Sequence, residues 1–502
     1  MRKLTFARRL CGRTDFFVSF IGGSLFILSS LCSVLATPPM IAPAPELQPT
    51  PNQPTTSETP PTAGFFTELS RSNYLLGDMG GLRPFLSKYG LTLSIQETSE
   101  VLGNVTGGVR QGFEYDGLTQ MVLQMDTQRA FGLYGGTFNV SGLQIHGRDL
   151  SADNLDTLQT SSGIEADRAS RLWELWYDQK FLKEDRLDVK IGQQSLDQEF
   201  MVSQNALLFV NTMFGWPMLP SADLPGGGPA YPLSALGVRA RLRPTDSLTV
   251  LAGIFNGRPV SNNNGDPQQE NATGTSFPTE NGALAIGELQ YSYPALGSMV
   301  YTDKTPLSGT YKLGFWYDTE SFADQQIDAN GLSLANPASN GVPRSHHGDY
   351  SIYAVADQMV WSDPNDEDAD RTVNVFARAM GAPLEDRNLI DISANAGLTF
   401  HEPIPHRGDD TFGIGMGYAK VGDGAVDLDK DTNAFGDTSF PVRSSEEFVE
   451  VTYQYQLTPW CQIQPDFQYV FNPGGGIPNP NYSSGPKIKD EAVIGIRTNI
   501  LF

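Results

Sequence analysis

Segments of about ten residues in which apolar and polar side chains alternate recur along most of this chain. In residues 448–457, FVEVTYQYQL, Val449 and Val451 alternate with Glu450 and Thr452. Successive side chains of a β-strand point to opposite faces of the sheet. Each segment therefore predicts a strand with one apolar and one polar face, and the chain is predicted to be all-β.

Two kinds of all-β structure show such alternation. A soluble sandwich, such as a lectin, turns its apolar faces inward and its polar faces to water. A transmembrane barrel turns its apolar faces outward to lipid and its polar faces into a wet lumen. The lengths of the connections between strands distinguish the two.

We count about sixteen strands from Leu91 onward, separated by connections that differ in length at the two strand ends. Short connections fall at residues 127–134, 182–186, 244–247, 361–370, 402–409 and 458–459, and longer ones above all at 194–233, 257–281, 318–348, 421–444 and 472–491. Short turns at one end and long loops at the other are typical of outer-membrane barrels. The predicted fold is a transmembrane antiparallel β-barrel of about 16 strands around an aqueous channel.

The last segment, EAVIGIRTNILF, alternates up to Phe502. Phe502, Ile500 and Thr498 share one face of an extended strand. Chain ends fray unless something holds them. We therefore expect this strand to pair with the first one, which closes the barrel and leaves no sheet edge exposed to lipid.

The N-terminal region is expected to lie outside the barrel. Residues 1–36 combine basic residues, an apolar run and a small residue, Ala36, as in a secretory signal peptide; a retained membrane anchor is the alternative. Residues 37–63 form a Pro-rich disordered spacer. Residues 64–90 include a short helix that Gly90 closes, and residues 91–502 form the barrel.

Composition excludes several classes of function. The net charge of −23 argues against a nucleic-acid partner. Cys461 would be the one cysteine left after loss of the signal peptide, so no internal disulfide is expected. The acidic run 363–370 lacks the spacing of a calcium loop, and His346 with His347 lacks a third ligand. We predict neither a metal site nor a cofactor.

Several motifs carry a family resemblance. LLGDMGGLRPFLSKYGLTL, EVLGNVTGG, RLWELWYDQKF, VKIGQQSLDQEF and FGWP resemble segments of the OprB-type carbohydrate-selective porins, over about residues 75–502. The resemblance implies a 16-stranded barrel, embedded in outer-membrane lipid of a Gram-negative bacterium, that passes sugars down their gradient. The terminal Phe502 resembles the signature that the barrel assembly machinery reads.

A sugar channel needs a constriction whose polar groups replace part of the sugar's water without holding it long. Cations and carboxylates bind sugar hydroxyls, and aromatic rings stack on C–H faces. Strict alternation points Trp173, Leu175 and Tyr177 to lipid. The predicted lumenal residues are Glu174, Trp176, Asp178, Asp188, Lys190, Arg239 and Arg241, with Lys180 and Arg243 beside them. Alternatively, these charges form a network that stiffens the wall.

The connection 194–233 contains ALLFVNTMFGWPML, which is too apolar for a solvated loop. Long loops in compact domains are usually functional or disordered. We expect this third loop to fold into the lumen and narrow the pore, with Asn211 and Trp216 as candidate substrate contacts. Alternatively, Trp216 anchors the loop to the wall.

Three functions fit a barrel of this kind. The leading prediction is a passive sugar porin, and a general ion or solute porin is the alternative. An outer-membrane enzyme would need a nucleophile paired with histidine, and the sequence shows no such pairing. Neither ion preference nor the choice of sugar follows from the sequence, and assembly into a homotrimer stays open.

Overall fold

The computed structural model describes residues 72–261, 265–294, 307–364, 371–482 and 485–502. The predicted signal peptide and Pro-rich spacer lie outside the described residues. So do residues 64–71 of the predicted N-terminal segment.

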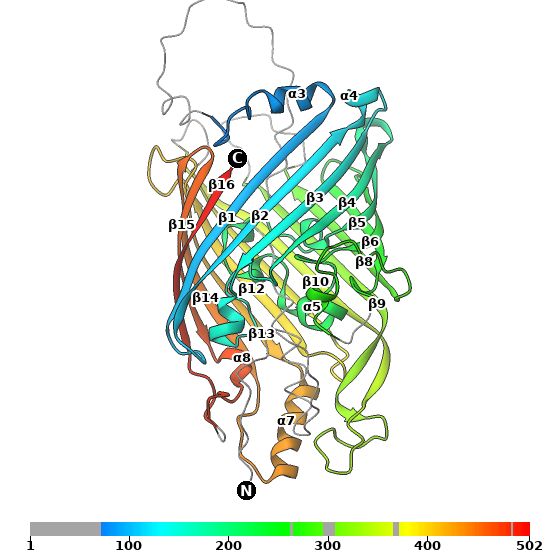
Figure 1. Ribbon diagram of the computed structural model, residues 1–502, viewed down its shortest axis with the longest axis vertical. Helices are drawn as coiled ribbons and strands as arrows, with labels where there is room; N and C mark the ends of the chain where they lie inside the picture. The colour runs from blue at the N-terminus through cyan, green and yellow to red at the C-terminus, as the bar shows by residue number, and fades with distance from the viewer. Residues whose placement is uncertain (1–71, 262–264, 295–306, 365–370, 483–484) are drawn as a thin grey trace, which may run out of the picture.

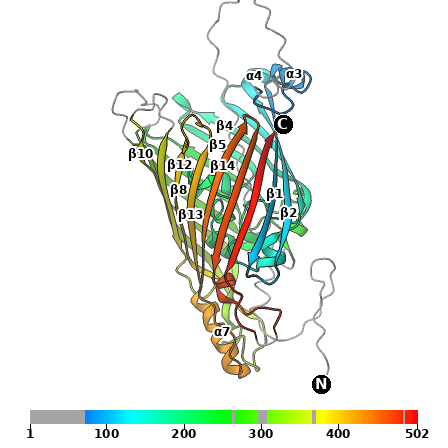
Figure 2. The ribbon, with the colours of Figure 1, turned by 90° about the vertical axis from the view of Figure 1, so that its left-hand side faces the viewer.

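The described chain forms one closed antiparallel barrel in which each strand pairs with its sequence neighbours and β1 pairs with β16 (Figures 1 and 2). The strands are β1 Leu91–Thr106, β2 Gly112–Asp126, β3 Gly136–Gly147, β4 Ala169–Phe181, β5 Leu187–Gln194, β6 Ala235–Leu242, β7 Leu248–Asn256, β8 Ala283–Tyr293, β9 Gly309–Asp328, β10 Pro343–Ser362, β11 Thr372–Gly381, β12 Ile390–His401, β13 Thr411–Val421, β14 Ser445–Thr458, β15 Cys461–Phe471 and β16 Glu491–Leu501. The predicted sixteen-stranded barrel is confirmed.

Helical segments lie in the connections. They are α3 Leu82–Lys88, α4 Thr127–Phe131, η1 Ser151–Leu155, η2 Lys183–Asp185, η3 Leu196–Gln198, η4 Ala206–Leu208, η5 Thr212–Phe214, α5 Met218–Asp223, η6 Pro225–Gly227, α6 Pro267–Glu270, α7 Asp423–Gly436 and α8 Pro473–Gly476. Among the described residues, none of these helices has the length and apolar character needed to span a membrane.

Two expectations about the connections were wrong. The predicted loop 318–348 is mostly strand, because β9 and β10 continue past the barrel wall to Asp328 and from Pro343. The predicted loop 421–444 contains α7, whose helical pattern is weak because only Ala425 and Leu428 are buried. A bidentate contact from Arg443 to a carboxylate of this helix, Asp429, holds it in place.

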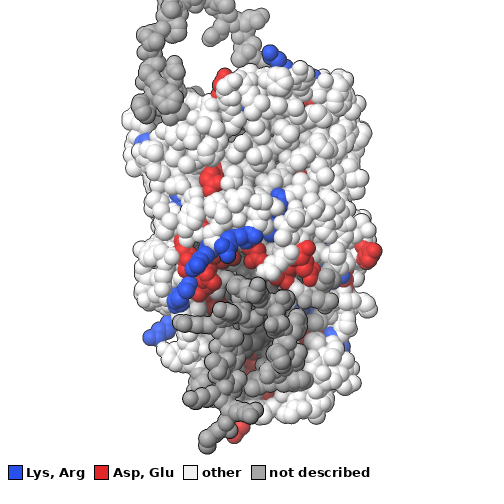
Figure 3. All heavy atoms as spheres, in the orientation of Figure 1, with Lys and Arg blue, Asp and Glu red and all other residues white. Residues whose placement is uncertain are grey.

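Side-chain polarity is inverted relative to a soluble protein over most of the wall. Large apolar residues such as Ile254, Leu313 and Phe315 are exposed on the outside, while Glu446 and Gln468 are buried inside. In Figure 3, charged side chains gather in a band toward the loop end, and the wall above the band is mostly uncharged. An apolar exterior over a polar interior is the arrangement that a lipid surround requires.

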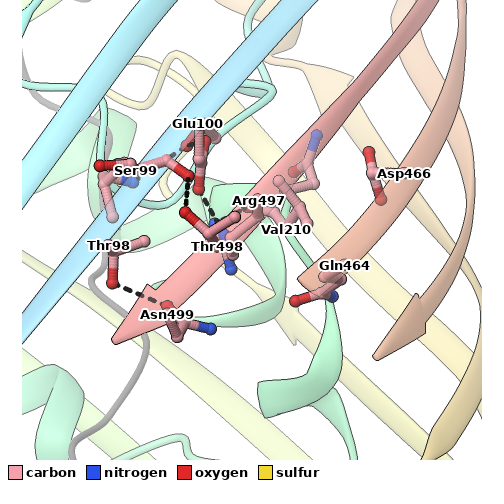
Figure 4. Close-up of polar contacts among 12 residues, drawn as sticks. Thr98, Ser99, Glu100, Val210, Gln464, Asp466, Arg497, Thr498 and Asn499 are labelled. Carbon is pink, nitrogen blue, oxygen red and sulfur yellow. Dashed lines mark hydrogen bonds and ion pairs between the residues drawn. The ribbon is translucent and has the colours of Figure 1, made fainter. Parts of the chain in front are cut away.

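The seam between β1 and β16 closes the barrel (Figure 4). Glu100 on β1 pairs with Arg497 on β16 inside the wall, and Thr98 donates a 2.8 Å hydrogen bond to Asn499. Arg497 also donates to the carbonyl of Val210 in the third loop at 3.4 Å. The seam therefore holds both the wall and the loop inside it.

The N-terminal helix α3 covers one end of this seam. Arg83 donates hydrogen bonds to the carbonyl oxygens of Leu93 (2.6 Å) and Phe502. The backbone N–H of Phe502 donates to Ile95 at 3.0 Å. The last residue thus lies one position beyond β16 and stays hydrogen-bonded to β1, with which β16 pairs as the alternation predicted.

We predict that Arg497→Ala destabilises the barrel by about 3–5 kcal/mol, because it leaves the Glu100 carboxylate buried without its partner. The free energy of unfolding in urea, followed by loss of the heat-modifiable folded band, measures this change. Lys183→Ala is the matched control, because the side chain of Lys183 is 92% exposed in a turn. Equal stability of the two variants would contradict the assignment.

Candidate functional site

Two long loops fold into the lumen and contact its wall. We call residues 148–168 the second loop and residues 195–234 the third loop. The third loop packs its aromatic side chains against the inner wall: Phe214 stacks on Phe209 with centroids 4.3 Å apart and meets Phe448 of β14 edge-on at 5.4 Å. The prediction that this loop folds into the lumen is confirmed.

Charged wall residues hold the loop backbones. Glu450 on β14 accepts hydrogen bonds from the backbone N–H groups of Val210 (2.6 Å) and Asn211 (3.0 Å). Glu446 does the same for Leu158 (2.8 Å) and Gln159 (2.7 Å) of the second loop. A buried polar group is tolerated only when it is hydrogen-bonded, so these contacts both satisfy the carboxyl oxygens and fix the loops.

Arginine plays the complementary role on β11. Arg378 donates hydrogen bonds to the carbonyl oxygens of Met201 (2.9 Å), Met213 (2.5 Å) and Gly215 (2.7 Å). Met201 follows η3, whereas Met213 and Gly215 belong to η5 and its C-terminal cap, so the contacts join two parts of the third loop. One guanidinium therefore gathers the loop into a compact plug with a fixed outline.

Six of the predicted lumenal residues meet in a ladder across β4, β5 and β6. One register row aligns Asp178, Lys190 and Arg239. The next row aligns Lys180, Asp188 and Arg241. Residues opposite one another in an antiparallel ladder share a face and lie close together. We call these six residues the charge ladder.

The ladder is tied together by ion pairs. Asp188 accepts from Arg239 and, at 2.7 Å, from Nε of Arg241. Asp178 lies 3.9 Å from Arg239. Nζ of Lys190 sits 4.5 Å above the ring of Trp176, a cation–π contact. The structure thus places these predicted lumenal residues side by side and adds one acid from the third loop.

That acid is Glu199, which follows η3. Its carboxylate pairs with Lys190 and lies 2.6 Å from Nε of Arg239. Glu174, also predicted to line the lumen, accepts a 3.1 Å hydrogen bond from the backbone N–H of Ser195. The start of the third loop is therefore fixed to the ladder wall. No periodic signal in the loop sequence singles out Glu199.

The six residues of the charge ladder differ in how far their side chains are exposed. The side chain of Arg241 is 43% exposed, whereas those of Arg239 and Asp188 are almost fully buried among their partners. Arg243, predicted beside them, instead binds the carbonyl oxygens of Glu184 and Asp185 in the β4–β5 turn. Within the ladder, Arg241 is the cation most accessible to a solute.

Asn211 and Trp216 lie inside the packed third loop, and each is 2% exposed. The Asn211 amide donates to Gln468 of β15 at 3.0 Å and accepts from the N–H of Met213. The Trp216 indole N–H donates to the carbonyl of Gly227 at 3.1 Å. The structure does not bring these two residues to the ladder, and their contacts are those of loop anchors.

The prediction that Trp173 faces lipid was wrong. The β3–β4 register shifts between Ser141 and Gly142, so β4 carries a bulge at Trp173. A bulge inserts one unpaired residue and reverses the alternation beyond it. Trp173 consequently points inward and meets Tyr231 of the third loop edge-on, with centroids 6.3 Å apart.

The same bulge turns Arg171 inward. Strict alternation places Arg171 on the same face as Trp173, toward lipid, where an arginine would cost about 2–4 kcal/mol near mid-membrane. That cost was the signal in the sequence that could have revealed the bulge. Instead, Arg171 is buried and donates to the backbone carbonyl of Gln268, at 3.3 Å, in the fourth loop (residues 257–282).

Arg171 lies where the second and fourth loops meet. Asp167, at the end of the second loop, donates its N–H to the side chain of Gln268 at 2.8 Å. Four polar atoms here are buried without a hydrogen-bond partner among the described residues: Nε and Nη1 of Arg171, Oδ2 of Asp167 and Nε2 of Gln268. Buried polar groups normally have partners, so these donors and this acceptor are left unsatisfied where the wall meets the two loops.

A cavity lies at the turn end of β12–β14. A cavity of about 210 Å³ is lined by residues including Asn205, Thr399, His401, Thr411 and Gln454. Within it, Thr411 and Nδ1 of His401 lie 3.0 Å apart, and Thr399 donates to Asn205 at 3.2 Å. The lining thus combines hydroxyl, amide and imidazole groups with the apolar side chains of Leu207 and Leu208.

Acidic and histidine side chains also lie close together outside the charge ladder. Glu385, Asp391 and Asp423 bring carboxylate oxygens together near the loop end, but Lys420 already neutralises Asp391 (3.1 Å) and Asp423 (2.8 Å). His346 lies 2.9 Å from Asp324. The acidic run 363–370 falls mostly outside the described residues. None of these groups adds to the lumenal site.

The pairing of Glu199 predicts a pH dependence. Burial alone would raise the pKa of this carboxyl, but Lys190 and Arg239 lower it from 4.5 to about 2. A depressed pKa means that its stabilising contribution is complete above about pH 4.5 and is lost as pH falls through about 2. We expect Glu199→Gln to loosen the start of the third loop relative to the native chain. The size of this effect should be the same at pH 7 and at pH 5.

Protease cleavage within the third loop, measured in both proteins across this range, tests the expectation. The difference between them should shrink only as pH falls from about 4.5 toward 2. A difference that disappears already near pH 6 would show that Glu199 is not held charged by the ladder.

Known proteins are similar to this chain in sequence and in fold. A sequence profile described as "Carbohydrate-selective porin, OprB family" matches residues 110–502. Porin B of Pseudomonas aeruginosa is 25% identical over 429 residues, covering 80% of this chain and 88% of that protein. "Putative porin QuiX" of Acinetobacter baylyi is 22% identical over 423 residues, covering 80% and 89%.

Among solved structures, the high-pH structure of Pseudomonas putida OprB is 23% identical and shares the fold with a TM-score of 0.74, over 86% of this chain and 99% of that one. The family profile spans most of the chain and includes all strands from β2 to β16. The chain therefore belongs to the OprB family of carbohydrate-selective porins of the Gram-negative outer membrane.

Proposed function

We propose that the protein lets monosaccharides such as glucose diffuse passively across the outer membrane through a narrow polar channel. The observation that supports this most directly is the unpaired group around Arg171. A sugar hydroxyl both donates and accepts hydrogen bonds, so one solute would serve the guanidinium N–H groups and the Asp167 carboxylate together. A simple ion would serve one kind of group and repel the other.

Passage requires that the site bind weakly enough to release the sugar. Arg171, Asp167 and Gln268 come from the wall and from two loops, and each is held by few contacts. Water replaces a departing sugar at each of these polar atoms, so the free energy of binding stays small. No energy source is needed, because the sugar follows its gradient.

The charge ladder would provide the second contact along the path. Arg241 and the Lys190–Trp176 pair offer a cation and an aromatic ring for sugar hydroxyls and C–H faces. Glu174, Asp178, Asp188 and Arg239 would keep these groups in position and set the local field. For Asn211 and Trp216 we propose an anchoring role, which keeps the third loop narrow without touching the sugar.

The remaining partners are proposed on the same basis. Outer-membrane lipid would surround the apolar exterior, and Phe502 would contact the barrel assembly machinery. A homotrimer is the proposed assembly. Residues 1–36 as signal peptide, 37–63 as spacer and 64–90 as N-terminal segment remain proposals about residues that lie mostly outside the structural description.

A channel rather than an enzyme is the role that the family and the interior favour. An outer-membrane lipase would place its nucleophile and histidine toward lipid, and the Arg171 group lies inside the barrel. Hydrolysis of phospholipid by the pure protein would instead support the enzyme. Current that glucose does not block would support a general porin.

Single-channel current in a planar bilayer, titrated with glucose, tests the proposal. Hydrogen bonds to charged groups contribute about 1.5–3 kcal/mol, so Arg171→Ala should raise the half-blocking glucose concentration by about 10- to 100-fold. Arg171→Lys should fall in between, because lysine keeps the charge and loses the planar fork. Arg241→Ala should give a smaller increase.

Arg186→Ala is the matched control. Arg186 lies in the β4–β5 turn, where it binds Glu184 (2.9 Å) and Asp246 (2.8 Å), and it should leave glucose block unchanged. If glucose blocks the current of Arg171→Ala as it does in the native protein, and blocks that of Arg241→Ala more weakly, the sugar site would lie at the charge ladder. Native block in both variants would contradict the proposal.

A further inference from the structure

Two arginines lie at the loop ends of β3 and β4 on the outer wall. Arg148 follows the last residue of β3, and Arg168 precedes the first residue of β4. Both are exposed, and neither guanidinium makes a hydrogen bond or an ion pair with any residue that the structure describes. The charge of Arg168 acts on the carboxyl group of Asp149 without an ion pair between them. Two cations are therefore available to a partner outside the barrel.

Hydrogen-bonding side chains continue from these arginines toward the middle of the strands. Ile145 of β3 is buried and pairs with Ala169 of β4. Side chains alternate along a strand, so the neighbouring residues Gln144, His146 and Ser170 face outward. Figure 1 shows β1–β4 side by side on the front wall, and in Figure 3 Lys and Arg side chains cross the same view at the edge of the charged band. The outer wall thus carries amide, imidazole and hydroxyl groups beside its cations.

Glu97 on β1 adds a carboxylate to this polar patch. Thr119 and Ser99 donate hydrogen bonds to it at 2.5 and 3.2 Å, and Nε2 of His146 lies 3.6 Å away. The side chains of Glu97 and His146 are 19% and 33% exposed, so both can be reached from outside the barrel. A carboxylate has about four acceptor sites, so Glu97 can accept further hydrogen bonds from a partner.

Exposed apolar side chains flank the polar patch on the same face. Val101 of β1 and Phe113 of β2 lie beside it, and Met121 of β2 and Phe138 of β3 lie toward the turn end. Lipid chains suit these apolar residues, but hydrocarbon offers no hydrogen bonds to the polar ones. Ionisable side chains on a membrane-facing surface normally have a partner or a function. The face therefore fits a partner that is itself part polar and part hydrocarbon.

We propose that this face binds a glycolipid of the outer leaflet through its phosphorylated sugar headgroup. Long loops of outer-membrane barrels lie outside the cell, so the loop ends of β3 and β4 reach the outer leaflet. Arg148 and Arg168 bind the phosphate groups, for which the planar guanidinium offers paired N–H donors. The sugar hydroxyls donate to Glu97, and the acyl chains cover the apolar residues toward the turn end.

The mixture of charges on this face favours a phosphorylated sugar over a simple phospholipid. Two cations on neighbouring strands suit a headgroup that carries more than one phosphate. Glu97 would repel a phosphate placed against it, whereas a sugar hydroxyl donates to a carboxylate. A phospholipid headgroup brings one phosphate and few hydroxyls, so it leaves part of the patch unpaired. This site lies outside the barrel, so it goes beyond the sugar path and does not depend on it.

Native mass spectrometry of the full-length barrel in detergent, titrated with diphosphorylated lipid A, tests the site. Arg148→Ala combined with Arg168→Ala should weaken binding by about 10- to 100-fold, because charge-assisted contacts to phosphate are lost. Lys183→Ala combined with Lys430→Ala is the matched control, since it removes two equally charged side chains that are 92% and 59% exposed elsewhere on the surface. It should leave binding unchanged. Equal affinity of the two double variants would overturn the proposal.

The choice of lipid gives a second test that needs no variant. The native protein should bind diphosphorylated lipid A at least several-fold more tightly than either its dephosphorylated form or phosphatidylglycerol. Equally tight binding of phosphatidylglycerol would show a general surface for anionic lipids, and equally tight binding of the dephosphorylated form would show no role for phosphate. Either result would contradict the site. Single-channel glucose block should stay native in the double variants, which shows that the barrel and its sugar path are intact.

Discussion

The structure depends on one constraint, which is that hydrocarbon supplies no hydrogen bonds to a peptide backbone. Every strand must therefore have two neighbours, and the pairing of β1 with β16 meets this requirement. Glu100 and Arg497 reinforce that seam from within. Closure also decides polarity, because the outside of a closed barrel meets lipid and the inside meets water and loops. The lumen can then hold more charge than a soluble core of the same size.

The lumenal charges divide into two groups by what they contact. Glu446, Glu450 and Arg378 are occupied by loop backbone, and they convert flexible connections into a rigid plug. Arg171 is buried with two of its N–H groups unpaired among the described residues, and the side chain of Arg241 is 43% exposed. The first group sets the width of the channel, and the second would recognise what passes. The loops have to be held in fixed positions, because a mobile loop would give the channel no constant width.

The strand count and the charge ladder were predictable from sequence. In a regular strand, the place of each residue in the alternation decides whether its side chain faces lipid or the lumen. The inward direction of Asp188 and Arg239 followed directly from their alternation with the apolar residues of their strands. The bulge at Trp173 was not predictable by alternation, since one extra residue reverses the face of everything before it, and Arg171 was missed for this reason. Glu199 and Gln268 lie in loops, where no period exists. The length of β9 and β10 was missed because strands that leave the membrane lose their apolar face.

Exposure also corrected the expectation for Trp216. A tryptophan in a lumenal loop looks like a stacking platform for a sugar, but its ring is enclosed by the loop's own residues. Composition alone does not distinguish an aromatic residue that holds a loop from one that meets a solute. The packing around it does, and here it favours the anchor. The narrowness of the pore then depends on apolar packing, and its selectivity on the few polar groups left open.

The most direct test of the central claim is the rate at which liposomes containing the purified protein swell in isotonic solutions of different solutes. Glucose, a disaccharide and a short ethylene-glycol polymer of glucose's size form the comparison. A narrow polar channel that recognises hydroxyls predicts fast entry of glucose, slower entry of the polymer and very slow entry of the disaccharide. Equal rates for glucose and the polymer would contradict sugar recognition and leave a general pore.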